Sequence, residues 1–318
     1  MKFISLFSGI GGFDLALERL GHTCVYANDI DKYCKIIYDK HFETKQTTQD
    51  IRTVKSTDIP YHDLLVGGFP CQSFSVAGKR GGFADTRGTL FFEIARILKE
   101  KQPRLFILEN VKGLLSHDQG KTFTTIIATL DELGYDLQWQ VLNSKNFGVP
   151  QNRERVFIIG HLRGTPRTEI FPIGESKQTS DGALGLQSVR QTAGTLGATD
   201  YKGTHNNIRE ISLSLDANYW KGIDNHGQRT AIVQRQPLKF LQRNQRNIEG
   251  DYSFTADTSN TNGVRVGSGI RRLTPRECER LQGFPDGWTE GVSDTQRYKM
   301  CGNAVTVNVV YEIARRLK

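Results

Sequence analysis

The chain has 318 residues, 37% of them hydrophobic and 24% charged, which is an ordinary globular composition. It contains no long apolar run, and its start, MKFISLFSGIGG, lacks the apolar core and cleavage site of a signal peptide, so we expect a cytoplasmic protein without a membrane span. Its five cysteines are odd in number and never spaced as CxxC, which argues against a disulfide framework or a metal cluster.

The net charge of +8 is concentrated in the later part of the chain. Residues 151–272 hold 17 Lys and Arg against 11 Asp and Glu, which accounts for +6 of the total. Such an excess favours a polyanionic partner such as a nucleic acid. A soluble, mildly basic domain without such a partner fits the charge equally well.

The first predicted elements form a strand, a glycine turn and a helix. A strand is predicted over residues 3–7, SGIGG follows at 8–12, and an amphipathic helix over 13–20 is stopped by Gly21. This arrangement at the start of an α/β domain is typical of a nucleotide-type cofactor site. The spacing is GxGG and not the dinucleotide GxGxxG, so the turn alone is a weak signal.

The second strand, predicted over 23–27, ends in Asn28-Asp29. Asp29 lies about twenty residues after the glycine turn, where an acidic side chain can accept hydrogen bonds from ribose hydroxyls. A helix is predicted over 31–42, and the later Asp50 is a second acid that is able to reach an adenine amino group. The alternative for Asp29 is a solvated carboxylate in a turn.

A cysteine follows the strand-like run 63–66 in the segment GGFPCQSFS, residues 67–75. The glycines permit a tight turn and the proline fixes the backbone before Cys71, which would place its thiol at the carboxyl end of a strand. Cys71 is therefore the candidate nucleophile, with a buried structural cysteine as the alternative. Residues 77–86 are rich in glycine and carry Lys79 and Arg80, which predicts a mobile basic lid.

The next strand, predicted over 105–108, ends in a carboxylate. Glu109 would share the crevice of Cys71 as an acid or hydrogen-bond partner, unless it only caps a helix. Helices are predicted over 89–99 and 121–133, and strands over 138–142 and 156–160. Arg153 and Arg155, two residues apart, face the same way if the last strand begins before them, and they would suit a carbonyl oxygen or a phosphate. A structural ion pair with Glu154 is the alternative.

The amino-acid composition changes between residues 162 and 269, where Gly, Thr, Asn, Ser and Gln dominate. A degenerate repeat of short strand-like runs with glycine-ended turns occurs at 193–203, 212–222 and 252–264. Helices are predicted again after this segment. One begins at Thr274-Pro275-Arg276-Glu277, and an apolar C-terminal helix runs through Leu317. The alternation of strands and helices over residues 1–160 predicts the α/β class, with a mostly parallel sheet and helices on its faces, and the later polar segment is compatible with a small sheet domain.

A thiol, a carboxylate, an arginine pair and a nucleotide-type cofactor together suit attack on an electron-poor heterocycle. A thiolate that adds to carbon 6 of cytosine makes carbon 5 nucleophilic, and Glu109 would bind ring nitrogen 3 and the exocyclic amine. A base inside a duplex is out of reach of such a site, so it has to be flipped out.

Seven segments occur in the order found in one known family: FSGIGGF (7–13), GGFPCQSFS (67–75), DTRGTLF (85–91), ENV (109–111), QNRER (151–155), RRLTPRE with QGFP (271–285) and GNAV (302–305). They resemble the motif series of the DNA cytosine-5 methyltransferases of bacteria and phages. The prolyl-cysteine, ENV and QxRxR segments are highly specific in combination, and the resemblance covers roughly 1–165 and 270–318.

The resemblance implies a role for each matching position. Cys71 would be the nucleophile and Glu109 the acid that recognises the base, while Arg155 contacts the cytosine carbonyl oxygen and Arg153 supports the pocket. The S-adenosyl-L-methionine site would comprise Phe7, Gly9, Gly11, Gly12, Asp29, Ile30, Asp50, Ile51, Pro70, Leu90, Asn303, Ala304 and Val305. Ile30 stands where some members carry an adenine-stacking Trp. DNA would be contacted by Gln72, Ser75, Lys79 and Arg80.

The resemblance also implies domains and partners. Residues 1–164 and 271–318 would form the catalytic domain, a doubly wound, mostly parallel α/β sheet, and residues 165–270 an inserted, small, β-rich target-recognition domain. Double-stranded DNA is the expected substrate, the protein is expected to be a monomer, and a cognate restriction endonuclease is a further expected partner. Some relatives methylate tRNA, and a catalytically silent DNA-binding regulator is a third alternative. The long polar insert favours a duplex groove as the surface that is read.

Overall fold

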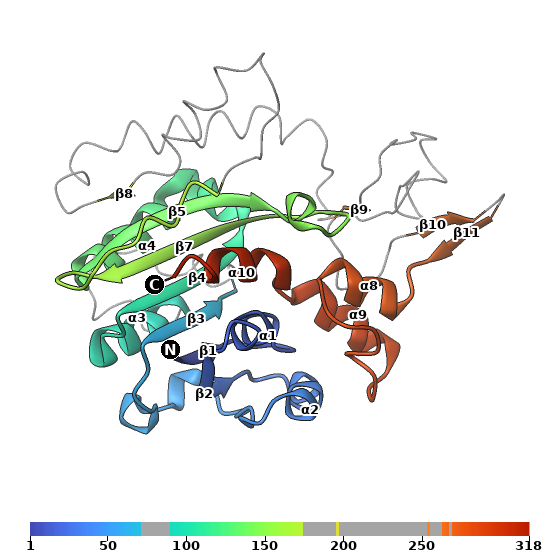
Figure 1. Cartoon of the computed structure of the whole chain (residues 1–318), viewed down its shortest axis with the longest axis horizontal. Helices are drawn as coiled ribbons and strands as arrows, with labels where there is room; N and C mark the ends of the chain where they lie inside the picture. The colour runs from blue at the N-terminus through green and yellow to red at the C-terminus, as the bar shows by residue number, and fades with distance from the viewer. Residues whose placement is uncertain (71–89, 174–194, 197–252, 255–262, 267–268, 318) are drawn as a thin grey trace, which may run out of the picture.

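A single large sheet organises the protein in the computed structural model, which describes residues 1–70, 90–173, 195–196, 253–254, 263–266 and 269–317. Its strand order is β2-β1-β3-β4-β7-β5-β8 (Figure 1). The strands are β1 (Lys2–Leu6), β2 (Thr23–Asn28), β3 (Leu64–Gly68), β4 (Leu105–Val111), β5 (Tyr135–Asn143), β7 (Glu154–Leu162) and β8 (Thr195–Leu196).

The two halves of the sheet differ in how neighbouring strands pair. The pairs β1–β2, β1–β3 and β3–β4 are parallel, whereas β4–β7, β5–β7 and β5–β8 are antiparallel. The predicted α/β class is confirmed, and the parallel half has the expected crossover helices. The sheet as a whole is mixed, because β5 and β7 form a long hairpin-like pair at its far side.

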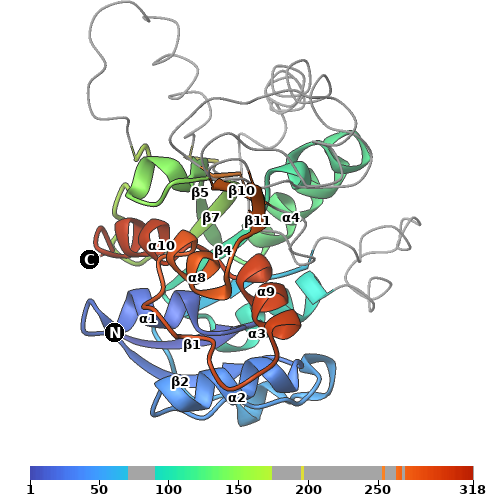
Figure 2. The same ribbon diagram turned by 90° about the vertical axis from the view of Figure 1, so that its right-hand side faces the viewer.

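Helices cover both faces of the sheet (Figure 2). One core joins α1 and α10 to the sheet, and α3 and α4 pack into a second core on the other face. Periodic apolar residues account for this layering, as in α3, where Phe91, Ile94 and Leu98 are buried on one side. The helices are α1 (Gly12–Glu18), α2 (Lys32–His41), α3 (Leu90–Lys101), α4 (Lys121–Glu132), α8 (Pro275–Leu281), α9 (Asp294–Asn303) and α10 (Val307–Ala314).

The C-terminal helix is broken, contrary to the prediction of one helix opening before Val305 and running through Leu317. The helix α9 ends at Asn303, Ala304 is extended, and α10 starts at Val307. The carbonyls of Gly302 and Ala304 accept hydrogen bonds from the buried Arg153 side chain instead of continuing a helical ladder. The predicted apolar face is confirmed, since Val305, Val309, Ile313 and Leu317 are buried.

Strand β4 is longer than predicted. It continues past residue 108 to Val111, which pairs with Arg155 of β7. The antiparallel partner extends the ladder, and the sequence of β4 alone does not show where that partner ends. Glu109 therefore lies within a strand and not after it.

Residues 165–173 pack onto the main sheet. The Gln138 side-chain oxygen accepts hydrogen bonds from the backbone N–H groups of Ile170 and Phe171, and both apolar side chains join the core under α10. The Ile173 N–H donates to Gln140 in the same way.

Beyond Ile173, the structure describes only short backbone segments before α8. The pair β6 (Gln151–Asn152) and β9 (Ser253–Phe254) is parallel, and β10 (Gly263–Val266) and β11 (Gly269–Arg272) form an antiparallel hairpin. Most of the predicted repeat, and the predicted lid at 77–86, lie outside the described residues. The predicted capping box is confirmed, because Thr274 and Glu277 bond each other's backbone N–H groups at the start of α8.

Within the described part of the chain, no helix is both long and apolar enough to cross a membrane.

Candidate active site

An acidic and a basic side chain meet at the carboxyl ends of β3 and β4. Glu109 lies opposite Gly68 of β3, and Arg155 of β7 lies opposite Val111, two positions further along β4. Successive residues of a strand alternate between faces, so Glu109 and Arg155 form a diagonal pair on one face. Arg155 Nε and Glu109 Oε1 are 3.1 Å apart, and the two side chains are 8% and 11% exposed. Glu109 therefore carries out none of the helix capping considered as its alternative.

The backbone beside Glu109 is shaped by glycine and fixed by an asparagine. A Cβ on Gly68 would lie 3.1 Å from Glu109 Oε2, so a glycine there leaves room for the carboxylate. The Asn110 side chain donates to the carbonyl of Phe69 over 2.8 Å. The exposed Pro70 follows at the same sheet edge. Five predicted site residues come after it and lie outside the described residues: Cys71, Gln72, Ser75, Lys79 and Arg80.

Arg153 and Arg155 have separate partners. Arg153 is fully buried between β6 and β7, and its Nη2 donates to the carbonyls of Gly302 and Ala304 over 3.1 and 2.8 Å. Burial, reinforced by the Arg155 charge, holds the pKa of Arg153 well below its usual range. The Glu154 carboxylate forms its ion pair with Lys112 at 2.9 Å, while the Glu154 backbone carbonyl accepts a hydrogen bond from Arg155 Nη1 over 2.8 Å. Arg153 thus fastens the α9–α10 break to the strand that carries Arg155.

The glycine turn between β1 and α1 has an unusual backbone. Phe7, Gly9 and Gly11 all have positive φ, at 54°, 55° and 85°. Glycine adopts this region readily, whereas Phe7 does so at a cost that its surroundings must offset. The direction that a Cβ would take from Gly9 is open to 4 Å, whereas Gly11 faces the Phe42 ring and Gly12 faces Val305.

Asp29 contacts this turn directly. Its Oδ2 accepts a hydrogen bond from the Gly9 N–H and its Oδ1 accepts one from the Asp31 N–H, both at 2.8 Å. Burial raises the pKa of the Asp29 carboxyl, while these two backbone donors act in the opposite sense. Asp29 is therefore a fixed, partly desolvated carboxylate, not the solvated turn residue considered as its alternative.

The other predicted cofactor residues differ in how they are placed. Asp50 caps a short 3-10 helix (Ile51–Thr53) and pairs with Arg52, whose hydrogen bonds lower the pKa of the carboxyl. Ile51 is buried, whereas Ile30, next to Asp29, is 68% exposed. Leu90 is half-buried at the start of α3. Asn303 is exposed at the end of α9, next to the buried Ala304 and Val305.

Two residues that the sequence analysis missed hold the turn. The Gln46 amide nitrogen donates to Ser8 Oγ and to the Gly9 carbonyl, at 2.8 and 2.9 Å. The Trp288 indole N–H donates to the Ile10 carbonyl over 3.0 Å. Neither residue belongs to a recognised motif. Local sequence patterns do not predict these contacts, because the partners lie 38 and 278 positions apart.

Comparison with known proteins identifies the family. The family model for C-5 cytosine-specific DNA methylases matches residues 1–318. The chain belongs to this family. It is 38% identical to Type II methyltransferase M.NgoBI of Neisseria gonorrhoeae, over 99% of this chain and 92% of the relative, and 38% identical to M.HhaI of Haemophilus parahaemolyticus, over 99% and 93%.

Solved structures share the fold of this C-5 cytosine-specific DNA methylase. A crystal structure of a DNMT2 variant from Spodoptera frugiperda has a TM-score of 0.64 at 20% identity, over 99% of this chain and 98% of that chain. The Dnmt2 methyltransferase of S. pombe has a TM-score of 0.59 at 17% identity, over 98% and 96%. The predicted methyltransferase fold and family are thereby confirmed.

The methyl donor of this family is S-adenosylmethionine, and the glycine turn of this methylase fits such a group. The open space at Gly9 is the place where backbone can approach a ligand closely, and Asp29 and the exposed apolar Ile30 adjoin it. A carboxylate, bare backbone and an apolar surface match a ribose and an adenine ring. Among the described residues, no group of His, Cys, Asp or Glu is placed to hold a metal ion.

Proposed function

We propose that this DNA cytosine-5 methyltransferase acts within one short DNA sequence, with Glu109 and Arg155 recognising the flipped target base and Cys71 attacking it. The observation that carries the proposal is the desolvated Glu109–Arg155 pair beside Pro70. The Watson–Crick edge of cytosine, opposite the reacting carbons 5 and 6, presents a carbonyl oxygen, ring nitrogen 3 and an amine. A guanidinium donates to the oxygen, and a carboxyl group bonds the nitrogens, so the pair matches this edge.

The proposed roles follow from where charge develops. Addition of the Cys71 thiolate to carbon 6 forms a carbon–sulfur bond and sends electron density toward ring nitrogen 3 and carbon 5. Glu109 stabilises the ring nitrogen and Arg155 the carbonyl oxygen, both from positions fixed by the β4–β7 ladder. When bound, S-adenosylmethionine supplies an electrophilic methyl group for carbon 5. Transfer of the carbon 5 proton to solvent then breaks the carbon 6–sulfur bond and releases the Cys71 thiolate.

The described cysteines do not compete for this role. Cys24, Cys34, Cys278 and Cys301 are all buried. Burial raises the pKa of the Cys24, Cys34 and Cys301 thiols, which keeps them protonated and unreactive. This supports the assignment of the nucleophile to the cysteine in the prolyl-cysteine segment.

The remaining predicted site residues are proposed to surround the cofactor and the DNA. Gly9, Asp29 and Ile30 would hold the ribose and adenine, and Arg153 would support the site through the Gly302 and Ala304 carbonyls. Asp50 would reach the adenine amine only if its carboxylate turned from Arg52. Gln72, Ser75, Lys79 and Arg80 are proposed to contact DNA.

A separate recognition domain is proposed between the two parts of the catalytic domain. The excess positive charge of residues 151–272 and their polar composition support a DNA-reading surface there. Because residues 165–173 pack on the main sheet, we place its start after Ile173. We also propose a cytoplasmic monomer that acts beside a cognate restriction endonuclease, in line with the Type II names of the relatives.

A competition assay tests the substrate and the nucleophile together. Methyl transfer from labelled S-adenosylmethionine is measured on duplex DNA and on tRNA, with Cys71→Ala and the buried-cysteine control Cys34→Ala. We expect label in DNA alone, lost in Cys71→Ala and retained in Cys34→Ala. Label in tRNA, or activity in Cys71→Ala, would contradict the proposal. Turnover by the wild-type chain also excludes a silent DNA-binding regulator.

A further inference from the structure

The glycine turn that the proposed function assigns to the cofactor needs outside support to keep its shape. Three of its residues have positive φ, and Phe7 among them is not a glycine. Such conformations persist only where the surrounding structure determines them fully. Within the turn itself, the described support is one backbone hydrogen bond, from the Gly11 N–H to the Ser8 carbonyl at 2.9 Å.

Trp288 reaches the centre of this turn from the loop between α8 and α9. Its indole N–H donates to the Ile10 carbonyl over 3.0 Å, and both residues are buried. Its ring stacks on His41 with centroids 3.7 Å apart and lies edge-on to Phe42 at 5.8 Å. Phe42 in turn fills the space in front of Gly11, where a Cβ would lie 2.2 Å from the ring. Trp288 thus supports the turn both directly and through Phe42.

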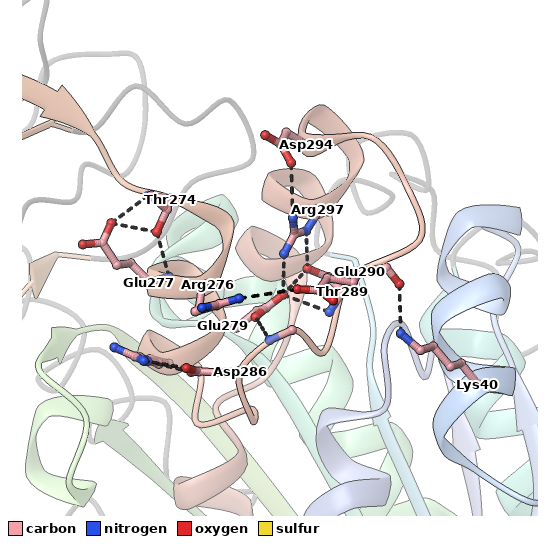
Figure 3. A network of polar contacts seen from close by, with 12 residues as sticks. Lys40, Thr274, Arg276, Glu277, Glu279, Asp286, Thr289, Glu290, Asp294 and Arg297 are labelled. Carbon is pink, nitrogen blue, oxygen red and sulfur yellow. Dashed lines mark hydrogen bonds and ion pairs between the residues drawn. The ribbon is translucent and has the colours of Figure 1, made fainter.

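The loop that carries Trp288 is itself fixed by a buried carboxylate (Figure 3). Glu279 of α8 is fully buried and accepts hydrogen bonds from the N–H groups of Gly287 and Thr289, on either side of Trp288, at 2.7 and 2.9 Å. Arg297 of α9 compensates its charge at 3.1 Å. The Lys40 side chain also bonds the Glu290 carbonyl, which fastens the loop to α2.

We infer that Trp288 is a positioning residue for the methyl donor, which it serves by holding the turn Phe7–Gly12 in its binding conformation before the cofactor arrives. A turn that is already ordered does not have to be ordered on binding, so Trp288 raises cofactor affinity without touching the reacting atoms. This inference rests on the proposed placement of S-adenosylmethionine at the turn.

The test compares Trp288→Phe with Trp139→Phe in the full chain. Trp288→Phe keeps an aromatic ring and removes the N–H bonded to Ile10, whereas Trp139 is also buried but lies in the core on the other face of the sheet. Binding of S-adenosylhomocysteine is titrated calorimetrically without DNA. We expect Trp288→Phe to raise the Kd about fivefold to tenfold, as for loss of a hydrogen bond that leaves a buried carbonyl unpaired, and Trp139→Phe to leave it unchanged.

Amide hydrogen exchange separates a loosened turn from a loosened protein. The Gly11 and Leu15 N–H groups are bonded to the Ser8 and Gly11 carbonyls, so they report on the turn. In unliganded Trp288→Phe they should exchange faster while the amides of β1 stay as in the wild type. In methyl-transfer assays, the KM for S-adenosylmethionine should rise while kcat at saturation stays within about twofold.

The possible results separate the role of Trp288 from the placement of the cofactor. Wild-type affinity in Trp288→Phe, or faster exchange throughout the protein with an unchanged Kd, would overturn the positioning role alone. Failure of the wild-type chain to bind S-adenosylhomocysteine would overturn the proposed cofactor site, and the inference with it.

Discussion

The proposed base-recognition corner, formed by Glu109 and Arg155, and the proposed cofactor turn, residues 7–12, are built by opposite means. At the corner, two charged side chains on neighbouring strands pair at 3.1 Å, and the register of the β4–β7 ladder decides that they meet. At the turn, the functional surface is backbone, and neutral groups from distant segments, such as Gln46 and Trp288, determine its shape. Changes at the corner should therefore affect the chemical step, whereas changes at the turn should affect stability and cofactor binding.

The largest effect is expected at the corner. Glu109→Gln keeps the shape of the side chain but removes the charge opposite Arg155 and the acid that we propose stabilises the base, so kcat should fall by on the order of a hundredfold or more. Cofactor affinity should stay as in the wild type. Single-turnover methylation and calorimetric binding measure the two quantities.

The neighbouring carboxylate provides the control for this substitution. Glu154 lies beside Arg155 in sequence but pairs with Lys112 near the surface, so Glu154→Gln should change kcat by no more than about twofold. Similar losses in the two variants would show that the Glu109–Arg155 pair has no special part in the reaction.

Gly9 and Gly11 of the turn differ in what an added Cβ would contact. Gly11→Ala forces a Cβ to 2.2 Å from the Phe42 ring at a φ of 85°, so we expect it to lower the free energy of unfolding by about 2–4 kcal/mol. Gly9→Ala meets open space at a φ of 55° and should cost only about 1 kcal/mol. Urea denaturation compares them, and equal costs would mean that Phe42 does not brace the turn.

The smallest expected effect is a pH dependence of the folding stability that arises from Asp14, in the helix that follows the turn. Asp14 of α1 is buried and accepts hydrogen bonds from Ser5 and Tyr38, and burial raises the pKa of its carboxyl. The folded chain thus retains a proton that the unfolded chain releases above pH 3.9 or so. The stability due to Asp14 is complete below that pH and falls, by at most about 1.4 kcal/mol per pH unit, as the pH rises through the folded pKa.

Asp14→Asn removes this titration and keeps a side chain of the same size. The stability of Asp14→Asn relative to the wild type should therefore increase as the pH is raised from about 4. Thermal unfolding across a pH series provides the measurement. A relative stability that does not vary with pH would show that Asp14 is ionised in the folded protein.

The comparison also explains what the sequence could predict. The strands, the helices and the positions of Glu109 and Asp29 near the carboxyl ends of β4 and β2 could be predicted from periodicity and chain order, because these are local patterns. The sequence does not predict that Arg153 and Arg155 have different partners. The partners of Arg153 are the carbonyls of Gly302 and Ala304, which lie far along the chain. Trp288 was missed for the same reason, because its partner Ile10 is 278 positions away.

Bisulfite sequencing of plasmid DNA from cells that express the protein tests the central claim most directly. The account predicts protected cytosines in one short sequence motif with the wild-type chain, and none with Cys71→Ala. Protection that persists in Cys71→Ala, or an absence of protection by folded wild-type protein, would contradict it.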